Sequence, residues 1–233
     1  MILSDRLESI IELIPRGCAC ADIGCDHGFV SIELVSRGIC PRVYGMDLRE
    51  GPLERARENV RAAGLEESIT LMLSDGFEKL EPGMVKTAVI AGMGGTLITD
   101  IIEKGMKVVE QMDEFVVQPQ SNIPEFRNHL RLKGFEIVRN NVIRDAGKYY
   151  FPMKIRYTGR CDESAALGIT PEDRYGADLI REDRGLSEYL EYEMNSMEKI
   201  LERLLSEEGD HEERVRDIRS LMELNRKIYS GTD

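Results

Sequence analysis

Hydrophobic residues along the first 157 positions alternate between short apolar runs and segments with helical periodicity. Short apolar runs are typical of buried strands, and apolar residues repeated at three- and four-residue steps are typical of amphipathic helices. The pattern predicts strands at 18–23, 42–46, 69–73, 85–90 and 114–117. It predicts helices at 4–14, 27–37, 51–63, 95–107 and 122–133. Two β-rich runs close the series, 135–143 and 149–157, joined by a turn at 145–147.

This alternation predicts an α/β fold, with a parallel sheet covered by helices on both faces and an antiparallel hairpin at its end. From about residue 172 the apolar residues recur at helical steps on both sides of Gly209, among densely charged positions. That pattern predicts two long helices packed as a hairpin with a coiled-coil-like seam. We expect a sheet domain at 1–160 and a helical domain at 161–233. The seam could be intramolecular or could pack against a second copy of the chain.

The composition excludes several classes of protein. Of the 233 residues, 42% are hydrophobic and 32% are charged, which is ordinary for a globular protein and unlike a disordered or collagenous one. No apolar run approaches the roughly 18 residues that span a bilayer, and the N-terminus lacks the apolar segment of a signal peptide. We therefore expect a cytoplasmic protein that does not enter a membrane. The five cysteines include no C-x-x-C pair, which predicts reduced, mostly buried thiols and no metal site.

The net charge of −12 argues at first against a nucleic-acid partner, but the charge is unevenly distributed. Residues 161–233 hold 20 acidic and 10 basic residues, and so most of the negative excess. Within 127–160 only Glu136 and Asp145 oppose a basic run, which consists of Arg127, Arg131, Lys133, Arg139, Arg144, Lys148, Lys154, Arg156 and Arg160. A charge run is usually a solvated face, but one this lopsided in an acidic protein indicates an anionic partner.

The most informative segment is Ala-Asp-Ile-Gly-Cys-Asp-His-Gly at 21–28, between a predicted strand and a predicted helix. In doubly wound folds, ligands bind beside this turn, and Gly24 and Gly28 would let the backbone turn tightly. A dinucleotide-binding turn needs glycines where this chain has Asp26 and Phe29, and a carboxylate there would repel a diphosphate. S-adenosylmethionine (SAM) carries an ammonium and a sulfonium but no phosphate, so an acidic turn suits it.

Two further strand ends carry acidic residues. Asp47 ends the second strand and can accept both hydroxyls of a ribose, and Asp75 ends the third and can accept the adenine amino group. Each alone is commonly a helix N-cap, but with Asp22 they place carboxylates at three successive strand ends. We therefore predict a SAM pocket, lined by Asp22, Gly24, Cys25, Gly28, Asp47, Leu48, Asp75, Gly76, Ala91 and Gly92.

Several segments then resemble one known family, the bacterial tRNA adenine-N1 methyltransferases that modify the adenine at position 22 in the D-arm. They are ADIGCDHGF (21–29), AGMGGTLI (91–98), QPQ (118–120), GKYY (147–150), LGITP (167–171) and the helical segment 185–201. The resemblance covers nearly the whole chain, and the combination of the first two segments is specific.

The resemblance implies a Rossmann-like class I methyltransferase with a C-terminal coiled coil, SAM as methyl donor and tRNA as substrate. It assigns seven residues to the cofactor or catalytic region: Asp22, Gly24, Asp26, His27, Asp47, Asp75 and Gly76. Phe29 is a departure, because we expect tyrosine there in relatives. Stacking on a base would survive that change, whereas a hydroxyl role would not.

Adenine N1 carries an in-plane lone pair, so the enzyme mainly has to position N1 in line with the S–CH3 bond. Asp26 could accept a hydrogen bond from the N6 amino group and stabilise the developing charge, or it could bind the methionine ammonium instead. His27 could assist proton movement. Because N1 lies on the pairing edge, the base must be splayed out, and an aromatic ring could stack on it. The predicted substrate contacts are Phe29, Met93, Gly94, Gly95, Arg127, Arg131, Lys133, Lys148 and Tyr149.

Three other functions remain open at this stage. The chain could be a methyltransferase of the same fold that acts on a small molecule or a protein, although the basic run counts against it. It could be a non-catalytic RNA-binding protein that retains the fold, although the three acidic strand ends count against that. It could also be an interaction protein whose function lies in the helices at 172–230.

Overall fold

The computed structural model describes residues 3–183, 185–207 and 211–231. The chain divides into two compact units, Met1–Arg174 and Tyr175–Asp233. From the sequence we expected the division after residue 160. The segment up to Arg174 groups with the first unit, where Arg131 forms ion pairs with both Asp162 and Asp173. No helix within the described ranges is long and apolar enough to cross a bilayer.

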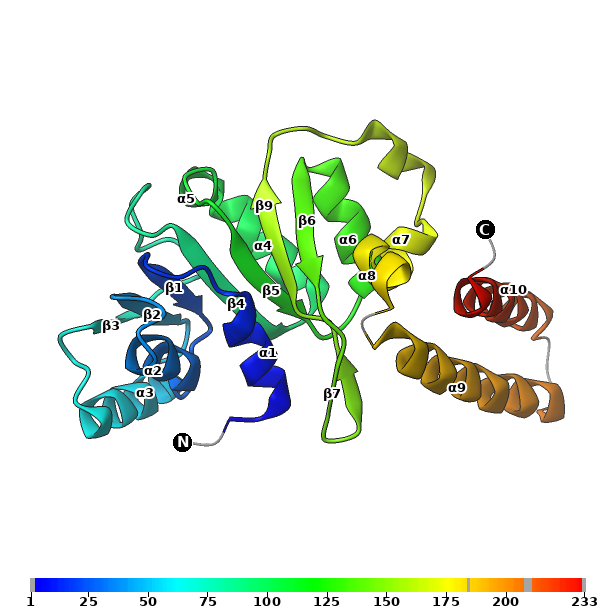
Figure 1. Ribbon diagram of the computed structural model, residues 1–233, viewed down its shortest axis with the longest axis horizontal. Coiled ribbons are helices and arrows are strands. Elements are labelled where there is room, and N and C mark those ends of the chain that lie inside the picture. Colours follow the sequence, from blue (N-terminus) through cyan, green and yellow to red (C-terminus); the bar gives the residue numbers. More distant parts are fainter. Residues whose placement is uncertain (1–2, 184, 208–210, 232–233) are drawn as a thin grey trace. The chain divides into compact units, whose positions relative to one another are not determined.

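A seven-stranded sheet forms the centre of the first unit, in the order β3-β2-β1-β4-β5-β9-β6 (Figure 1). Five strands run in parallel: β1 (Cys20–Ile23), β2 (Val43–Asp47), β3 (Ile69–Leu73), β4 (Thr87–Met93) and β5 (Phe115–Pro119). The strand β9 (Met153–Tyr157) pairs antiparallel with β5 and with β6 (Phe135–Asn140). The predicted closing hairpin is therefore confirmed. Its turn forms a separate small hairpin, β7 (Ile143–Asp145) with β8 (Lys148–Tyr150).

Helices cover both faces of the sheet, which confirms the predicted fold class. One face carries α1 (Asp5–Leu13), α2 (Phe29–Ser36) and α3 (Glu50–Ala63), and the other carries α4 (Gly95–Lys104), α5 (Met106–Val109) and α6 (Ile123–Leu132). Successive strand residues alternate between two apolar clusters, as period-two side chains must. In β4, for example, Val89 packs in the cluster of α1 to α3, whereas Ala88 and Ile90 pack in that of α4 to α6.

The helix predicted at 95–107 is divided in two at Gly105. The ring of Phe77 packs so closely against Gly105 that a β-carbon there would overlap it. Close packing between segments far apart in sequence thus decides where this helix ends. After β9, a 3-10 helix η1 (Glu163–Leu167) and the short helix α7 (Pro171–Tyr175) follow.

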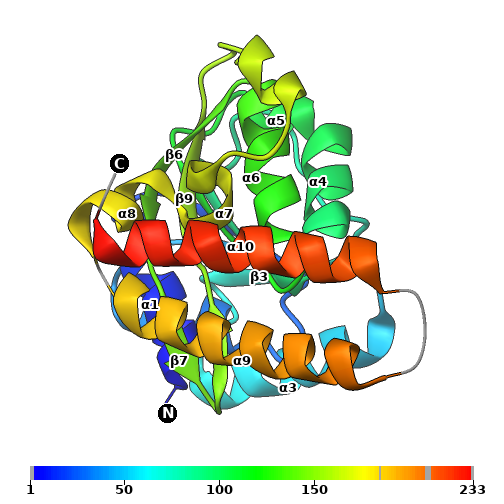
Figure 2. The same cartoon turned by 90° about the vertical axis from the view of Figure 1, so that its right-hand side faces the viewer.

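The second unit contains α8 (Ala177–Glu182) and two long helices, α9 (Leu186–Ser206) and α10 (Glu212–Ser230), which lie side by side (Figure 2). The predicted seam is present, since Met197, Leu204, Ile218 and Met222 are buried between these helices. Leu205, one of the apolar residues that recur at helical steps before Gly209, is exposed. Adjacent helix residues point about 100° apart, so Leu204 and Leu205 do not both face α10. Gly209, expected between the helices, lies outside the described residues.

One polar side chain is buried in this apolar seam. The Nδ2 of Asn225 donates to the backbone oxygen of Leu190 at 3.2 Å and to Oε2 of Glu193 at 2.9 Å. The hydroxyl of Tyr175 donates to the same Glu193 oxygen at 2.7 Å. Because a buried amide is costly without partners, these bonds favour one alignment of α9 against α10.

Candidate functional site

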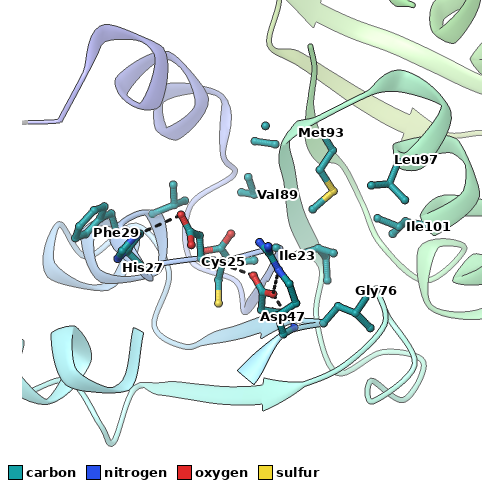
Figure 3. Close-up of a pocket in the computed structure, with 18 of the residues that line it drawn as sticks. Ile23, Cys25, His27, Phe29, Asp47, Gly76, Val89, Met93, Leu97 and Ile101 are labelled. Atoms are coloured by element: carbon teal, nitrogen blue, oxygen red, sulfur yellow. Dashed lines mark hydrogen bonds and ion pairs between the residues drawn. The ribbon is translucent and has the colours of Figure 1, made fainter. Parts of the chain in front are cut away.

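A pocket of about 580 Å³ opens at the carboxyl ends of the parallel strands (Figure 3). It lies where the chain order in the sheet reverses between β1 and β4, which is where doubly wound folds bind ligands. The volume is in the usual range for small-molecule sites. Most of the residues predicted for the cofactor, the base and catalysis line it: Asp22, Gly24, Cys25, Asp26, His27, Phe29, Asp47, Leu48, Asp75, Gly76, Ala91, Gly92 and Met93.

Four backbone amides of the first turn donate to the protein itself. Gly24 and Cys25 both donate to the carbonyl oxygen of Met46, at 2.7 and 2.9 Å. Asp26 donates to Oδ2 of Asp47 at 3.3 Å, and Gly28 donates to the carbonyl of Cys25 at 2.7 Å. A diphosphate-binding turn needs such amides directed at the ligand. These four amides are not directed at a ligand, which disfavours a diphosphate beside them.

Asp22 places a carboxylate at the start of α2. Its Oδ2 accepts from the backbone N–H of Ser31 at 3.2 Å and from the Ser31 hydroxyl at 2.7 Å. The protein thus supplies the anion that a helix N-terminus attracts. Burial raises the pKa of Asp22 to about 6, against the lowering effect of the two Ser31 bonds. Since both bonds go to Oδ2, the second oxygen can accept from a cationic ligand in the pocket.

Asp26 and His27 lie on the more exposed side of the turn. Asp26 has a left-handed backbone with φ of 48°, which non-glycine residues rarely adopt, and its side chain is 58% exposed. The His27 Nε2 is 3.6 Å from Asp26 Oδ2. The His27 ring stacks on Phe29, with ring centres 5.4 Å apart and planes 10° apart. Figure 3 shows His27 and Phe29 on the side of the pocket opposite Leu97 and Ile101.

The next two acidic strand ends differ in burial. Asp47 is nearly buried, and its Oδ1 accepts from the backbone N–H of Arg49 at 2.9 Å. The side chain of Asp75 is 40% exposed, with the Lys104 ammonium 3.4 Å away. Both line the same pocket, as the sequence predicts. The buried Asp47 carboxylate, held by the Arg49 amide, can orient hydroxyl donors of a ligand, and the more exposed Asp75 can accept from an amino donor.

The interior wall of the pocket is apolar. The Met93 side chain extends from β4 between the two sides (Figure 3), and its methyl group lies where a β-carbon of Gly24 would be. Burial, together with the charges of Asp22 and Asp47, raises the pKa of the Cys25 thiol. Cys25 is therefore neutral near pH 7 and serves as a small apolar wall residue. As the sequence predicts, Cys20, Cys25 and Cys40 are buried thiols.

Three glycines predicted in the site do not line the pocket, namely Gly28, Gly94 and Gly95. Gly28 precedes α2 and packs against Ala56 of α3. Gly95 begins α4, and a β-carbon there would come within 2.8 Å of the Ser121 carbonyl oxygen. A β-carbon at each of these three glycines would lie close to a neighbouring segment, so the structure gives them a packing role.

The structure also corrects the expectation that Arg127 binds RNA. Its side chain is fully buried. The guanidinium donates to the carbonyl oxygens of Asp173 and Arg174, at 3.2 and 2.9 Å, and to Oδ1 of Asn140 at 3.2 Å. This arginine therefore joins α6, β6 and α7 rather than facing solvent.

Much of the remaining basic run is neutralised by nearby carboxylates. Arg131 is partly buried and forms a bidentate pair with Asp173. Four ion pairs share the pattern of a basic residue against an acidic one from another element: Arg131 with Asp162, Lys133 with Glu103, Lys154 with Glu114, and Arg156 with Glu136. The excess of positive charge in residues 127–160 is therefore largely offset by acidic residues that lie close to it in the folded protein.

The small hairpin of β7 and β8 keeps a basic surface next to the pocket. Arg144 and Lys148 are exposed on it, and the Arg144 guanidinium lies 5.8 Å from the ring centre of Tyr149. The neighbouring Tyr150 ring lies 5.4 Å from the guanidinium of Arg6, which itself lines the pocket. Lys148 and Tyr149, predicted for the substrate, therefore belong to an element adjoining the pocket wall.

Sequence reasoning missed four polar residues of the pocket: Arg6, Arg49, Ser74 and Gln120. Arg6 belongs to the helix predicted at 4–14, in which no site residue was predicted. It lies four residues before the buried Ile10, and so on the apolar face of α1. A basic residue on an otherwise apolar helix face was the sequence feature that could have indicated a functional role. Gln120 lies within the QPQ segment, whose residues had no assigned role.

Comparison with known proteins gives the family. A family model described as a methyltransferase domain matches residues 3–153. The tRNA (adenine(22)-N(1))-methyltransferase of Bacillus subtilis (strain 168) is 30% identical over 148 residues, which are 64% of this chain and 62% of that protein. The matched part of the chain thus spans less than two thirds of this curated relative.

Solved structures match over a greater length. The m1A22 tRNA methyltransferase of B. subtilis has a TM-score of 0.81 at 25% identity, with 98% of this chain and 99% of that chain covered. A candidate tRNA (m1A22) methyltransferase of Streptococcus pneumoniae, crystallised with S-adenosyl-L-methionine, has a TM-score of 0.85 at 27% identity, with 98% and 100% covered. The resemblance found in the sequence is confirmed, and the chain belongs to the methyltransferase family.

Proposed function

We propose that this protein transfers a methyl group from SAM to N1 of the adenine at position 22 of tRNA. The observation that carries the proposal is the acidic pocket at the strand ends, beside a turn in which four backbone amides donate within the protein. Such a pocket suits a cationic cofactor without phosphate. The similarity to tRNA (adenine(22)-N(1))-methyltransferases names the substrate and the target atom. A tRNA substrate agrees with a cytoplasmic location.

The pocket residues fit the parts of SAM in order along the sheet. We assign Asp75 to the adenine amino group, Asp47 to the ribose hydroxyls and Asp22 to the ammonium. Gly24 leaves room for the methionine chain once the Met93 side chain turns aside. Bound SAM supplies an electrophilic methyl group on its sulfonium.

The exposed side of the turn is assigned to the target base. Asp26 accepts a hydrogen bond from the N6 amino group, and its charge stabilises the positive charge that develops on the ring during methylation at N1. The stacked pair of His27 and Phe29 offers an aromatic surface for the base that leaves the tRNA stack. Asp26 has a left-handed backbone, its N–H donates to Asp47, and its side chain is 58% exposed, so its carboxylate is accessible to a base in a way that the buried Asp22 is not.

We assign phosphate contacts to the hairpin of β7 and β8 because its exposed cations lie next to the pocket through Tyr150 and Arg6. Arg144 and Lys148 would bind backbone phosphates beside a splayed-out adenine, and Tyr149 would stack on a neighbouring base. Arg139, exposed on β6, leads into the same hairpin.

The proposal is tested by incubating the protein with unmodified tRNA and methyl-labelled SAM and mapping the label. We expect one labelled nucleotide, 1-methyladenosine at position 22, and no label in a tRNA carrying guanine at that position. Label on another nucleotide would overturn the target assignment. Label on a protein or on a small molecule, with none on tRNA, would overturn the tRNA proposal and leave a methyltransferase of another substrate class.

A further inference from the structure

The pocket carries negative charge on one side and a cation on the other. The carboxylates of Asp22, Asp47 and Asp75 stand at the ends of β1, β2 and the turn after β3. Arg6 of α1 lines the opposite part, near β4 and β5. Its Nη1 donates to Oε1 of Gln118 at 3.2 Å. This partner is neutral, and no carboxylate pairs with Arg6 in the described part of the chain.

Two donor groups meet over a single glycine at this end of the pocket. A β-carbon built on Gly92 would lie 3.6 Å from Arg6 Nη1 and 3.9 Å from Gln120 Nε2. Gly92 has no side chain and a φ of 79°, so this space stays open to a ligand. Arg6 and Gln120 both line the pocket and can therefore donate together to one group of atoms placed there.

Arg6 is held in place from three directions. Its guanidinium lies 5.4 Å from the ring centre of Tyr150, donates to Gln118, and borders Gly92. A guanidinium fixed in this way loses little side-chain freedom when it binds an anion, which favours tight recognition of a planar carboxylate.

From this geometry we infer that Arg6, assisted by Gln120, binds the α-carboxylate of SAM. The inference rests on the proposed function. SAM has one anionic group, at the far end from its adenine. With the adenosine at Asp47 and Asp75, an extended cofactor crosses β1 and brings its amino-acid end toward Arg6. The ammonium then meets Asp22 and the carboxylate meets the guanidinium, so each charge has a partner of opposite sign.

The other arginine of the pocket, Arg49, does not fit this role. It belongs to the β2 side, beside the ribose position, and its side chain is 77% exposed. Its Nε lies 4.0 Å from Oδ1 of Asp47, so a carboxylate partner already faces it. Arg49 therefore serves as a matched control for a general loss of positive charge.

The test compares two ligands by calorimetry: S-adenosylhomocysteine and its decarboxylated analogue, which keeps the ammonium but lacks the carboxylate. We expect the wild-type protein to prefer S-adenosylhomocysteine. Arg6→Gln should lower the affinity for S-adenosylhomocysteine about 10- to 100-fold and change the affinity for the analogue by less than about twofold. The preference for S-adenosylhomocysteine would then be lost. Arg6→Lys should restore part of it. Arg49→Gln should change both ligands by the same factor.

A second variant covers the possibility that Arg6→Gln disturbs α1. Gln120 is exposed, so Gln120→Glu should fold normally and repel a carboxylate. This variant should lower the affinity for S-adenosylhomocysteine but not the affinity for the analogue. Equal effects on both ligands, or no effect on either, would overturn the assignment of Arg6. If the wild-type protein binds neither ligand, the assignment of SAM as the cofactor in the proposed function is wrong. If the wild-type protein shows the preference but does not methylate tRNA, the assignment of Arg6 to the carboxylate is retained and the assignment of tRNA as substrate is wrong.

Discussion

The acidic strand ends and the basic run at 127–160 both stand out in the sequence, but folding treats them in opposite ways. Asp22, Asp47 and Asp75 are far apart in the chain and line one pocket. The basic residues are close in the chain and become separated, with Arg127 buried and Lys133 paired with Glu103.

The cause is topology. Parallel strands end at the same edge of a sheet, so residues at successive strand ends converge whatever their separation in sequence. A run that crosses a helix, two strands and a hairpin distributes its side chains over several faces, and each face brings its own carboxylates. Position at a strand end is thus better evidence of a site than charge density.

The sharpest test of the acidic region is Asp26→Ala. If its carboxylate holds the base edge, kcat should fall about 10²- to 10³-fold, because a preorganised group facing the developing charge is lost. Cofactor affinity should change less than about threefold. Single-turnover methylation of tRNA and calorimetry with S-adenosylhomocysteine measure the two effects. A large loss of cofactor affinity would instead make Asp26 the ligand of the ammonium.

The buried part of the basic run can be tested with Arg127→Met, which keeps the stem and removes the guanidinium. The carbonyls of Asp173 and Arg174 and the amide oxygen of Asn140 would lose a charged donor. The free energy of unfolding should fall by about 3 kcal/mol, measured by denaturant titration. The folded variant should bind tRNA within about twofold of wild type. A tRNA-specific loss at unchanged stability would contradict the burial of this side chain.

The pH dependence of cofactor binding tests the buried carboxylate. Since the pKa of Asp22 is raised to about 6, a cationic ligand binds best above that pH, where the carboxylate is charged. Affinity should fall up to about tenfold per pH unit below 6 and stay constant above it. Asp22→Asn should bind weakly without this dependence, and the same slope in that variant would assign the titration to another group.

The free energy of unfolding depends on pH in the opposite direction from cofactor affinity. Without ligand, the folded protein holds the Asp22 proton more tightly than the unfolded chain does. The contribution of this group to the free energy of unfolding should therefore decrease as pH rises from about 4 to 6 and then level off. Comparing wild type with Asp22→Asn by thermal unfolding across that range isolates the effect.

The smallest effects are expected at single exposed cations. Lys148→Ala should leave stability unchanged and reduce the slope of log K against log salt for tRNA by about 0.9. Lys133→Ala is the matched control, because its ammonium is 2.8 Å from Glu103, and should alter neither the slope nor the stability by a measurable amount. Equal slopes in both variants would remove the hairpin from the RNA surface.

The sequence predicts the strands, the pocket edge and the acidic residues because local periodicity and topology determine them. Arg6 was not predicted, since its role depends on Gly92 and Tyr150, which only the tertiary structure brings near. Arg127 was misassigned for the same reason, because its acceptors lie up to 47 residues away. Gly95 was predicted to contact the substrate but does not line the pocket, since it packs against backbone from the loop after β5.

The inward-directed amides of the first turn also bear on how this scaffold could be redesigned. Replacing Asp26 and Phe29 by glycine would recreate the letters of a dinucleotide fingerprint. The N–H groups of Gly24 and Cys25 would still be held by the Met46 carbonyl, and Asp22 would still occupy the start of α2. Because these contacts involve backbone groups and Asp22, replacing Asp26 and Phe29 alone should leave the affinity for a nicotinamide dinucleotide low and should remove two residues of the proposed methyltransferase site.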